Sequence, residues 1–255
     1  MSTAVESMGS LNTSSSVAPS DEPEEVLAAQ NRRLFDRLGL PEEVHGGKRV
    51  QAPRDACARL HAACLAAFEA SNARGDEGGL FLSAAGREKC FWGFQNYDRV
   101  QATLNPRVQR KNTTMLPLHE VEDVSWQALL FAGLDGLSEL VAYAKGLAGE
   151  NMMLACHMLR QDSLQACFGW HQDNLNNPHT KISMVFLLSP TRSSMQVAGA
   201  EPFVYDGVGS GVLFPSEAHH RSGSASAGTL KITFFFGANQ SSAAMFLSRK
   251  MRGEW

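Results

Sequence analysis

The segment His171-Gln172-Asp173 places an imidazole and a carboxylate two residues apart. Side chains at positions i and i+2 of a β-strand lie on the same face, so one short strand could present both groups to a single cation. A second histidine from a distant strand would complete a set of two histidines and one carboxylate. Such a set leaves neighbouring metal positions open for oxygen and a chelating ligand, which suits iron(II). The spacing alone also fits an ordinary histidine at the end of a polar strand.

Two adjacent histidines, His219 and His220, are the candidates for the third ligand. They follow a short apolar run that ends at Phe214-Pro215-Ser216. Neighbouring residues on a strand point to opposite faces, so only one of the two should reach a metal. Strand alternation by itself leaves the choice between them open.

The strand expected at residues 229–236 has two contrasting faces. One face is wholly apolar and should pack against helices: it carries Leu230, Ile232, Phe234 and Phe236. The other face carries Lys231 and Thr233, together with Thr229 and Phe235. A lysine in a cavity needs an anionic partner, which a dicarboxylate would provide. The alternative is an edge strand with Lys231 in solvent.

Composition restricts the classes of protein that fit. The chain has 255 residues, 44% hydrophobic and 19% charged, with a formal net charge of -3, which does not suit a general nucleic-acid binder. The five cysteines form no Cys-x-x-Cys pair, so we expect no disulfide framework, no zinc site and a reducing compartment. No secretory signal or membrane-spanning run is apparent. We therefore expect an intracellular protein, cytoplasmic or nuclear, with no membrane partner.

The order of the expected elements indicates an α+β fold. Residues 1–22 are rich in Ser, Thr, Pro and acids and are expected to form a disordered tail before a single domain at 23–255. Helical patterns cover 24–38, 53–73 and 121–147, the last with a break expected at Gly133 or Gly136. Two strands are expected within 80–98, and a basic surface loop over 99–117. Short strands then dominate residues 150–240, which predicts a sandwich or barrel with helices on one face.

The ordered motifs resemble the 2-oxoglutarate- and iron(II)-dependent dioxygenase superfamily, in particular its prolyl-hydroxylase-like branch. The resemblance covers roughly residues 152–237 and rests on His-x-Asp, a strand ending in Phe-Pro, a histidine shortly afterwards, and a cation followed at i+2 by a hydroxyl. The spacing of that pattern favours His220 over His219. The chain departs from it at Ala198-Gly199-Ala200, where the family usually has Gly-Gly.

The resemblance implies a double-stranded β-helix, or jelly roll, with supporting N-terminal helices. It implies that His171, Asp173 and His220 hold Fe(II). It also implies that Lys231 and Thr233 bind the distal carboxylate of 2-oxoglutarate. The expected reaction uses O2 to hydroxylate a C–H bond and releases succinate and CO2, so the same residues form the expected catalytic site.

The substrate stays open at this point: it could be a protein side chain, a small molecule or a nucleic acid. Asn174, Asn176 and Asn177 give a weaker likeness to the methylcytosine and thymine dioxygenases that act on DNA. Two other classes also remain. One is a catalytically silent jelly-roll module that binds a ligand or partner, and the other is a cupin-type metalloenzyme that uses no 2-oxoglutarate.

Overall fold

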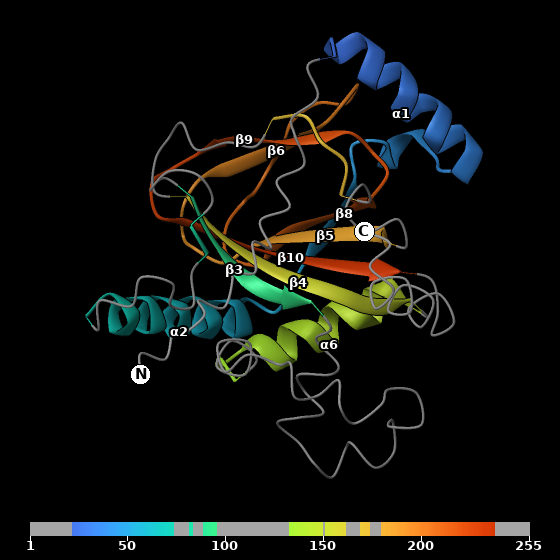
Figure 1. Cartoon of the computed structure of the whole chain (residues 1–255). Coiled ribbons are helices and arrows are strands. Elements are labelled where there is room, and N and C mark those ends of the chain that lie inside the picture. Colours follow the sequence, from blue (N-terminus) through green and yellow to red (C-terminus); the bar gives the residue numbers. More distant parts are fainter. Residues whose placement is uncertain are drawn as a thin grey trace, which may run out of the picture.

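The computed structural model describes residues 22–73, 82–83, 89–95, 133–149, 151–161, 169–173 and 180–237. Two antiparallel sheets face each other within this part of the chain (Figure 1). The larger sheet has the order β1 (Lys48–Gln51), β8 (Ser210–Pro215), β5 (Thr180–Leu187), β10 (Thr229–Gly237), β4 (Met152–Gln161), β3 (Lys89–Gln95) and β2 (Leu82–Ser83). The smaller sheet has the order β7 (Phe203–Val204), β6 (Ser193–Val197) and β9 (His220–Ala225). This arrangement is the α+β jelly roll predicted from the sequence.

The helices lie outside the sheets. Helix α2 (Arg54–Ala73) and helix α6 (Leu137–Ala148) cover the outer face of the larger sheet, and α1 (Glu24–Leu38) lies beside the smaller one (Figure 1). A short 3-10 turn, Glu42–Val44, leads from α1 to β1. Gly39 ends α1 in the left-handed conformation with φ of 64°, which glycine adopts without a steric cost. The helices expected at 24–38 and 53–73 are confirmed to within one residue.

The third expected helix is only partly described. Residues 101–132 lie outside the described part of the chain, and α6 begins directly after Gly136, which has a φ of 81°. Gly136 was one of the two glycines at which a break was expected. The tail at residues 1–21, the basic loop at 99–111 and the segment 174–179 with its asparagines also lie outside the described residues. The predictions made for them therefore stay predictions.

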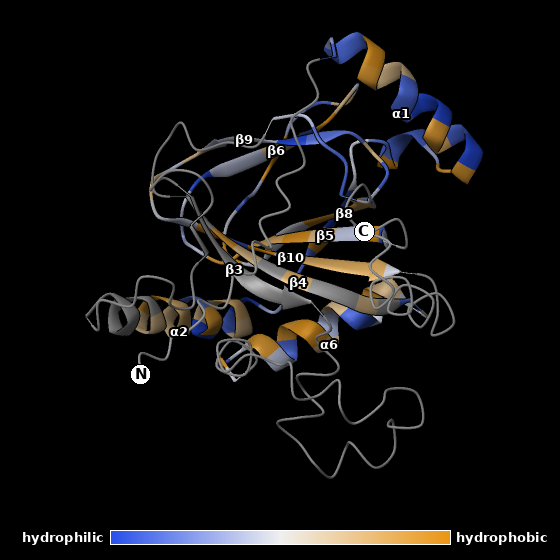
Figure 2. Ribbon diagram, in the orientation of Figure 1, coloured by the Kyte–Doolittle hydropathy of each residue, from blue (hydrophilic) through white to orange (hydrophobic). Residues whose placement is uncertain are grey.

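The apolar face of β10 packs into the main core, as predicted from its alternation. Its four apolar residues share one buried cluster with α2 and α6: Leu230, Ile232, Phe234 and Phe236 contact a layer that includes Leu60 and Leu140. Figure 2 shows the hydrophobic residues of α6 and of β10 in this layer. Because β10 lies between β5 and β4 inside the larger sheet, the alternative of an edge strand is wrong. The opposite face of β10 therefore points into the space between the sheets.

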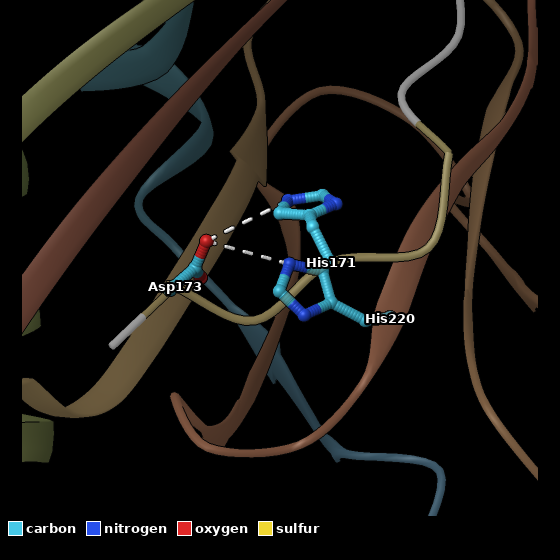
Figure 3. A group of neighbouring side chains, drawn as sticks. All are labelled: His171, Asp173 and His220. Carbon is cyan, nitrogen blue, oxygen red and sulfur yellow. Dashed lines mark ion pairs between the residues drawn. The ribbon is translucent and has the colours of Figure 1, made fainter. Parts of the chain in front are cut away.

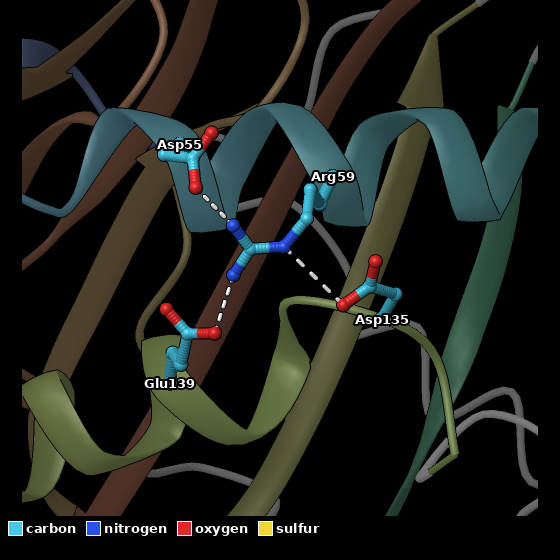
Figure 4. A network of polar contacts seen from close by, with 4 residues as sticks. All are labelled: Asp55, Arg59, Asp135 and Glu139. Carbon is cyan, nitrogen blue, oxygen red and sulfur yellow. Dashed lines mark hydrogen bonds and ion pairs between the residues drawn. The ribbon is translucent and has the colours of Figure 1, made fainter.

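One arginine links the two covering helices (Figure 4). Arg59 of α2 pairs with Asp55 on its own helix, with Glu139 of α6, and with Asp135 at 3.3 Å in the turn before α6. Each of these solvent-exposed pairs stabilises the fold only slightly. Together they fix how α2 and α6 lie on the sheet, far from the groups discussed below.

Three of the five cysteines have described side chains. Cys57, Cys64 and Cys156 are buried and free. Burial raises the pKa of the Cys57 thiol to about 11, so this group stays protonated and unreactive at neutral pH. Among the described helices, none is both long enough and apolar enough to cross a membrane.

Candidate metal centre

The structure brings His171, Asp173 and His220 together at one end of the space between the sheets (Figure 3). One ligand atom from each residue lies within 4.8 Å of the other two. The Asp173 Oδ1 atom is 3.7 Å from His171 Nε2 and 3.5 Å from His220 Nε2. Two imidazole nitrogens and one carboxylate oxygen that converge in this way can hold one divalent metal ion on a single face.

Backbone pairing explains why residues so far apart in the sequence meet. His171 and His220 exchange two backbone hydrogen bonds, of 2.9 and 3.0 Å, so His171 forms an isolated β-bridge with the first residue of β9. The amide of Asp173 donates to the carbonyl of Ser216 at 3.0 Å, which ties the carboxylate to the end of β8. The Phe214-Pro215-Ser216 motif therefore has a structural role, since the Phe214 ring also packs against His220 at 4.6 Å.

Both imidazoles are oriented by a hydrogen bond to the backbone carbonyl two residues earlier in the chain. The Nδ1 atom of His171 lies 2.8 Å from the carbonyl of Gly169, and that of His220 lies 2.9 Å from the carbonyl of Ala218. A carbonyl can only accept a hydrogen bond, so each Nδ1 carries the hydrogen. The Nε2 atoms of both rings consequently lie on the side of Asp173, the ring position from which these histidines could bind a metal.

Two of the three groups are in the protonation state that binds a cation, whereas a metal ion has to compete with a proton at His220. Burial lowers the pKa of His220, but the Asp173 carboxylate and hydrogen bonds to Asp173 and Ala218 outweigh burial and raise it. Burial raises the pKa of Asp173, but His220, His171 and a hydrogen bond from Ser183 outweigh that effect and lower it to about 2. Burial and the neighbouring His220 lower the pKa of His171 to about 4. At neutral pH the site thus offers an ionised carboxylate and a neutral His171 imidazole, both in the state that binds a metal.

His219 lies outside this group. Its Nδ1 atom is buried and has no hydrogen-bond partner among the described residues, and its backbone contacts α1 instead. The structure thus places His220 with His171 and Asp173, at the position that the family spacing favours. His157 lies opposite Thr233 in the β4–β10 register, but its side chain is outside the described part.

Lys231 lies deep between the sheets, with only 3% of its surface exposed. Among the described residues, no carboxylate or hydrogen-bond acceptor pairs with its ammonium group, and Nζ lies over the Tyr205 ring, 5.5 Å from the ring centre. Burial lowers the pKa of Lys231 to about 8. A buried cation without an anion is costly, so Lys231 is a candidate for binding a negatively charged group.

Two hydroxyl groups at the same depth also lack partners among the described residues. The Tyr205 Oη and the Ser193 Oγ are buried and make no hydrogen bond. Tyr205 donates its backbone amide to the Ser193 carbonyl at 3.0 Å, so the two residues are neighbours, and the Tyr205 ring lies near Lys231. Sequence reasoning missed both. The alternation of Met195 and Val197 with Gln196 was a signal that Ser193 shares their inward face, but nothing local placed Tyr205 next to Lys231.

The strand register of the larger sheet shows how Lys231 lies relative to the metal group. Opposite pairs along β10 and β5 are Lys231 with Leu187, Thr233 with Val185, and Phe235 with Ser183. Ser183 is the residue that bonds Asp173, so Lys231 and the metal group lie at two levels of one strand face, with Thr233 between them. Four residues separate the levels along β5, a rise of about 13 Å.

Fold and site together define a jelly-roll protein with a two-histidine, one-carboxylate group and a buried cation facing it. No protein-family model matches the chain, and no curated protein matches it. Among solved structures it is similar to a 2-oxoglutarate/iron(II) oxygenase-family oxidoreductase from Burkholderia pseudomallei (17% identity, TM-score 0.39, covering 87% of this chain and 95% of that one).

Two further similar structures are prolyl hydroxylases. One, from Trichoplax adhaerens, was solved with a peptide fragment of the hypoxia-inducible factor oxygen degradation domain (11% identity, TM-score 0.47, covering 87% of this chain and 94% of that one). The other is a prolyl-4-hydroxylase from Pseudomonas putida (18% identity, TM-score 0.43, covering 84% of this chain and 100% of that one). These structures come from the superfamily that the sequence motifs resemble. Identities and TM-scores are low, so the chemistry has to be derived from the chain's own side chains.

Proposed function

We propose that the protein is an Fe(II)- and 2-oxoglutarate-dependent oxygenase that hydroxylates a C–H bond of its substrate. One observation carries the proposal. A two-histidine, one-carboxylate group and a buried lysine without a partner among the described residues lie at two levels along the inner face of the larger sheet. The first feature suits iron(II) with open positions, and the second suits a carboxylate held at a fixed distance from it.

Each part of the site has a distinct task in this proposal. His171, Asp173 and His220 hold the metal, and the Gly169 and Ala218 carbonyls keep both imidazoles in the binding tautomer. Bound iron(II) with 2-oxoglutarate and O2 supplies the oxidation, which converts the cosubstrate to succinate and CO2 while the substrate gains a hydroxyl group.

At the other end of the cavity, the Lys231 ammonium binds the distal carboxylate of the cosubstrate. The hydroxyl groups of Tyr205, Ser193 and Thr233 are placed to donate to the same group. The apolar side chains of Val185 and Leu187, opposite Thr233 and Lys231 on β5, exclude water from the path between the two ends. Exclusion of water strengthens the contact between the ammonium group and the carboxylate.

The proposal is tested by supplying Fe(II), 2-oxoglutarate and oxygen to the purified full-length chain and measuring succinate by mass spectrometry. We expect succinate to form only when both Fe(II) and 2-oxoglutarate are present, and to stop when the metal is chelated. An anaerobic titration gives a second readout that needs no substrate, because iron(II) chelated by a 2-oxo acid has a visible charge-transfer band.

The alternative classes give different outcomes in these experiments. A catalytically silent module would form no succinate under any condition. A cupin-type enzyme without a cosubstrate would bind iron but show no charge-transfer band with 2-oxoglutarate. Either result would overturn the proposal.

The substrate can be sought with the same assay. A panel of proline-containing peptides, small molecules and DNA oligonucleotides with modified bases covers the three substrate classes that the sequence leaves open. A true substrate should raise succinate release and gain one oxygen atom per succinate formed. We propose no single class among the three.

The affinity for 2-oxoglutarate should depend on pH through Lys231. Its pKa in the free protein is about 8, lowered by burial, so the ammonium group is charged below that pH and loses its proton above it. Binding should therefore be strongest below pH 8 and weaken by roughly ten-fold per pH unit above it, because the neutral amine offers no charge to the carboxylate. The anaerobic charge-transfer titration at several pH values measures this dependence.

The matched control for this experiment is Lys231→Arg. A guanidinium group stays protonated throughout this range, so the variant should bind 2-oxoglutarate with little dependence on pH between 7 and 9. An equal loss of affinity in both proteins would show that another group titrates, and Lys231 would then not be the cosubstrate ligand.

A further inference from the structure

Helix α1 packs beside the smaller sheet, and its Leu34 and Phe35 reach the core that the two sheets share (Figure 1). Leu27 of α1 shares a buried apolar cluster with Trp170 and Ala198. Trp170 directly precedes His171 in the sequence, and its side chain lies on the outside while His171 points inward. The helix therefore contacts the strand segment that carries the first two metal-binding residues, from the face opposite the metal.

Asn31 is the polar centre of this contact. It lies on α1 with 1% of its surface exposed, an unusual place for an asparagine in a helix. Its side-chain amide donates to the carbonyls of Ala198 at 3.1 Å and His219 at 3.0 Å, and its Oδ1 accepts from the His219 amide at 2.8 Å. One side chain thus binds both backbone polar groups of the residue directly before His220.

The residue after His220 is held from the same side. The Arg221 guanidinium lies 4.2 Å from the Trp170 ring centre and donates to Gln196 at 2.7 Å. It also reaches Glu24 of α1 at 3.4 Å. Both chain neighbours of His220 are therefore fixed by groups on or beside α1.

The close approach of α1 depends on one glycine. Gly199 has a φ of 88°, and a Cβ atom there would lie 2.9 Å from the Cβ of Ala28 on α1. A larger residue at this position would push the helix away from the sheet. The approach brings Asn31 within hydrogen-bonding distance of the Ala198 carbonyl, next to this glycine.

We propose that Asn31 is a positioning residue for the metal centre, acting on His220 through the backbone of His219. Its hydrogen bonds set the segment 218–220, which supplies both the His220 ring and the Ala218 carbonyl that orients it. The inference rests on the proposed function in that the three inward side chains hold a metal. Partners that orient a metal ligand typically change metal affinity by roughly ten- to a hundred-fold when they are removed.

The first test measures manganese(II) binding to the full chain by electron paramagnetic resonance. Asn31→Ala should raise the dissociation constant for manganese(II) by roughly ten-fold relative to wild type. Gln30→Ala is the matched control, since Gln30 is exposed on the same helix and its side chain bonds only Glu22 among the described residues. The control should bind manganese(II) as wild type does.

A second variant covers the case in which Asn31→Ala does not fold. Asn31→Asp has the same shape and keeps the acceptor for the His219 amide, but it loses both donated hydrogen bonds. It should also bind manganese(II) more weakly. A purely structural role would lower the melting temperature of the variants while leaving the dissociation constant of the folded protein unchanged, and that result would overturn the proposal.

The wild-type protein offers an independent measurement. Coupling between two sites is reciprocal, so if α1 supports the metal centre, the metal must in turn stabilise the docked helix. Adding manganese(II) should slow hydrogen exchange in peptides covering residues 24–38. Unchanged exchange there, despite metal binding, would contradict the inference. Failure of the wild type to bind manganese(II) at all would instead contradict the proposed function.

Discussion

Replacing Asp173 with alanine is expected to abolish metal binding and all metal-dependent succinate formation. Asp173 supplies the only negative charge in the group of three, and its Oδ1 lies 3.7 and 3.5 Å from the two imidazole Nε2 atoms. Two neutral imidazoles without that charge hold a hard divalent ion poorly, so metal affinity should fall by more than about a hundred-fold. Manganese(II) titration and succinate measurement both report the loss.

The fold should survive this substitution. The strand that carries Asp173 is held by backbone hydrogen bonds that alanine retains, including the one from its amide to Ser216. Asp206→Ala is the matched control, because the Asp206 carboxylate is solvent-exposed and forms an exposed ion pair with Arg49, at 3.5 Å. Unaltered metal affinity in Asp173→Ala, with a normal circular dichroism spectrum, would show that the three side chains do not form the metal centre.

Lys231→Ala is expected to raise the concentration of 2-oxoglutarate needed for half-maximal activity by roughly ten- to a hundred-fold. The estimate comes from a charge-assisted hydrogen bond in a shielded cavity, which contributes about 1.5–3 kcal/mol. Metal affinity should change little, because Lys231 lies four residues along the sheet from the level of Ser183 and Asp173. Titrating 2-oxoglutarate and manganese(II) separately distinguishes the two effects.

Two further variants make the Lys231 experiment specific. Lys231→Arg keeps the charge but changes its geometry, so it should retain part of the activity. Lys48→Ala removes an exposed lysine on β1 and should leave the cosubstrate requirement as in wild type. Equal dependence on 2-oxoglutarate in wild type, Lys231→Ala and Lys231→Arg would require the cosubstrate assignment to be withdrawn.

Local sequence patterns were sufficient where the geometry is itself local. The two-residue period of a strand predicted that His171 and Asp173 share a face, and that Lys231 lies opposite the apolar residues of β10. The Gly39 stop and the two early helices follow from similar short-range rules. Such features are set by the backbone conformation of a few neighbouring residues and depend little on the rest of the fold.

Features that depend on packing between distant segments were not predictable. Tyr205 follows β7 of the smaller sheet and Lys231 belongs to the larger one, so their contact exists only once the sheets face each other. The hydrogen bonds from Asn31 to Ala198 and His219 likewise join segments 167 and 188 residues apart. Neither pair has a sequence signature, because no fixed spacing relates its members.

On the proposed function, the backbone pairing between β5 and β10 sets a fixed length for the cosubstrate between Lys231 and the metal group. The separation of the Lys231 level from the Ser183 level is set by main-chain hydrogen bonds and is therefore independent of side-chain identity. Point substitutions can alter how tightly each end of the cavity binds, but they leave the length between the ends unchanged. Only inserting or deleting residues in these strands would alter it, and a shift of one residue would turn Lys231 into the helix layer. The register of these two strands, and not the identity of their side chains, would thus determine which length of cosubstrate fits.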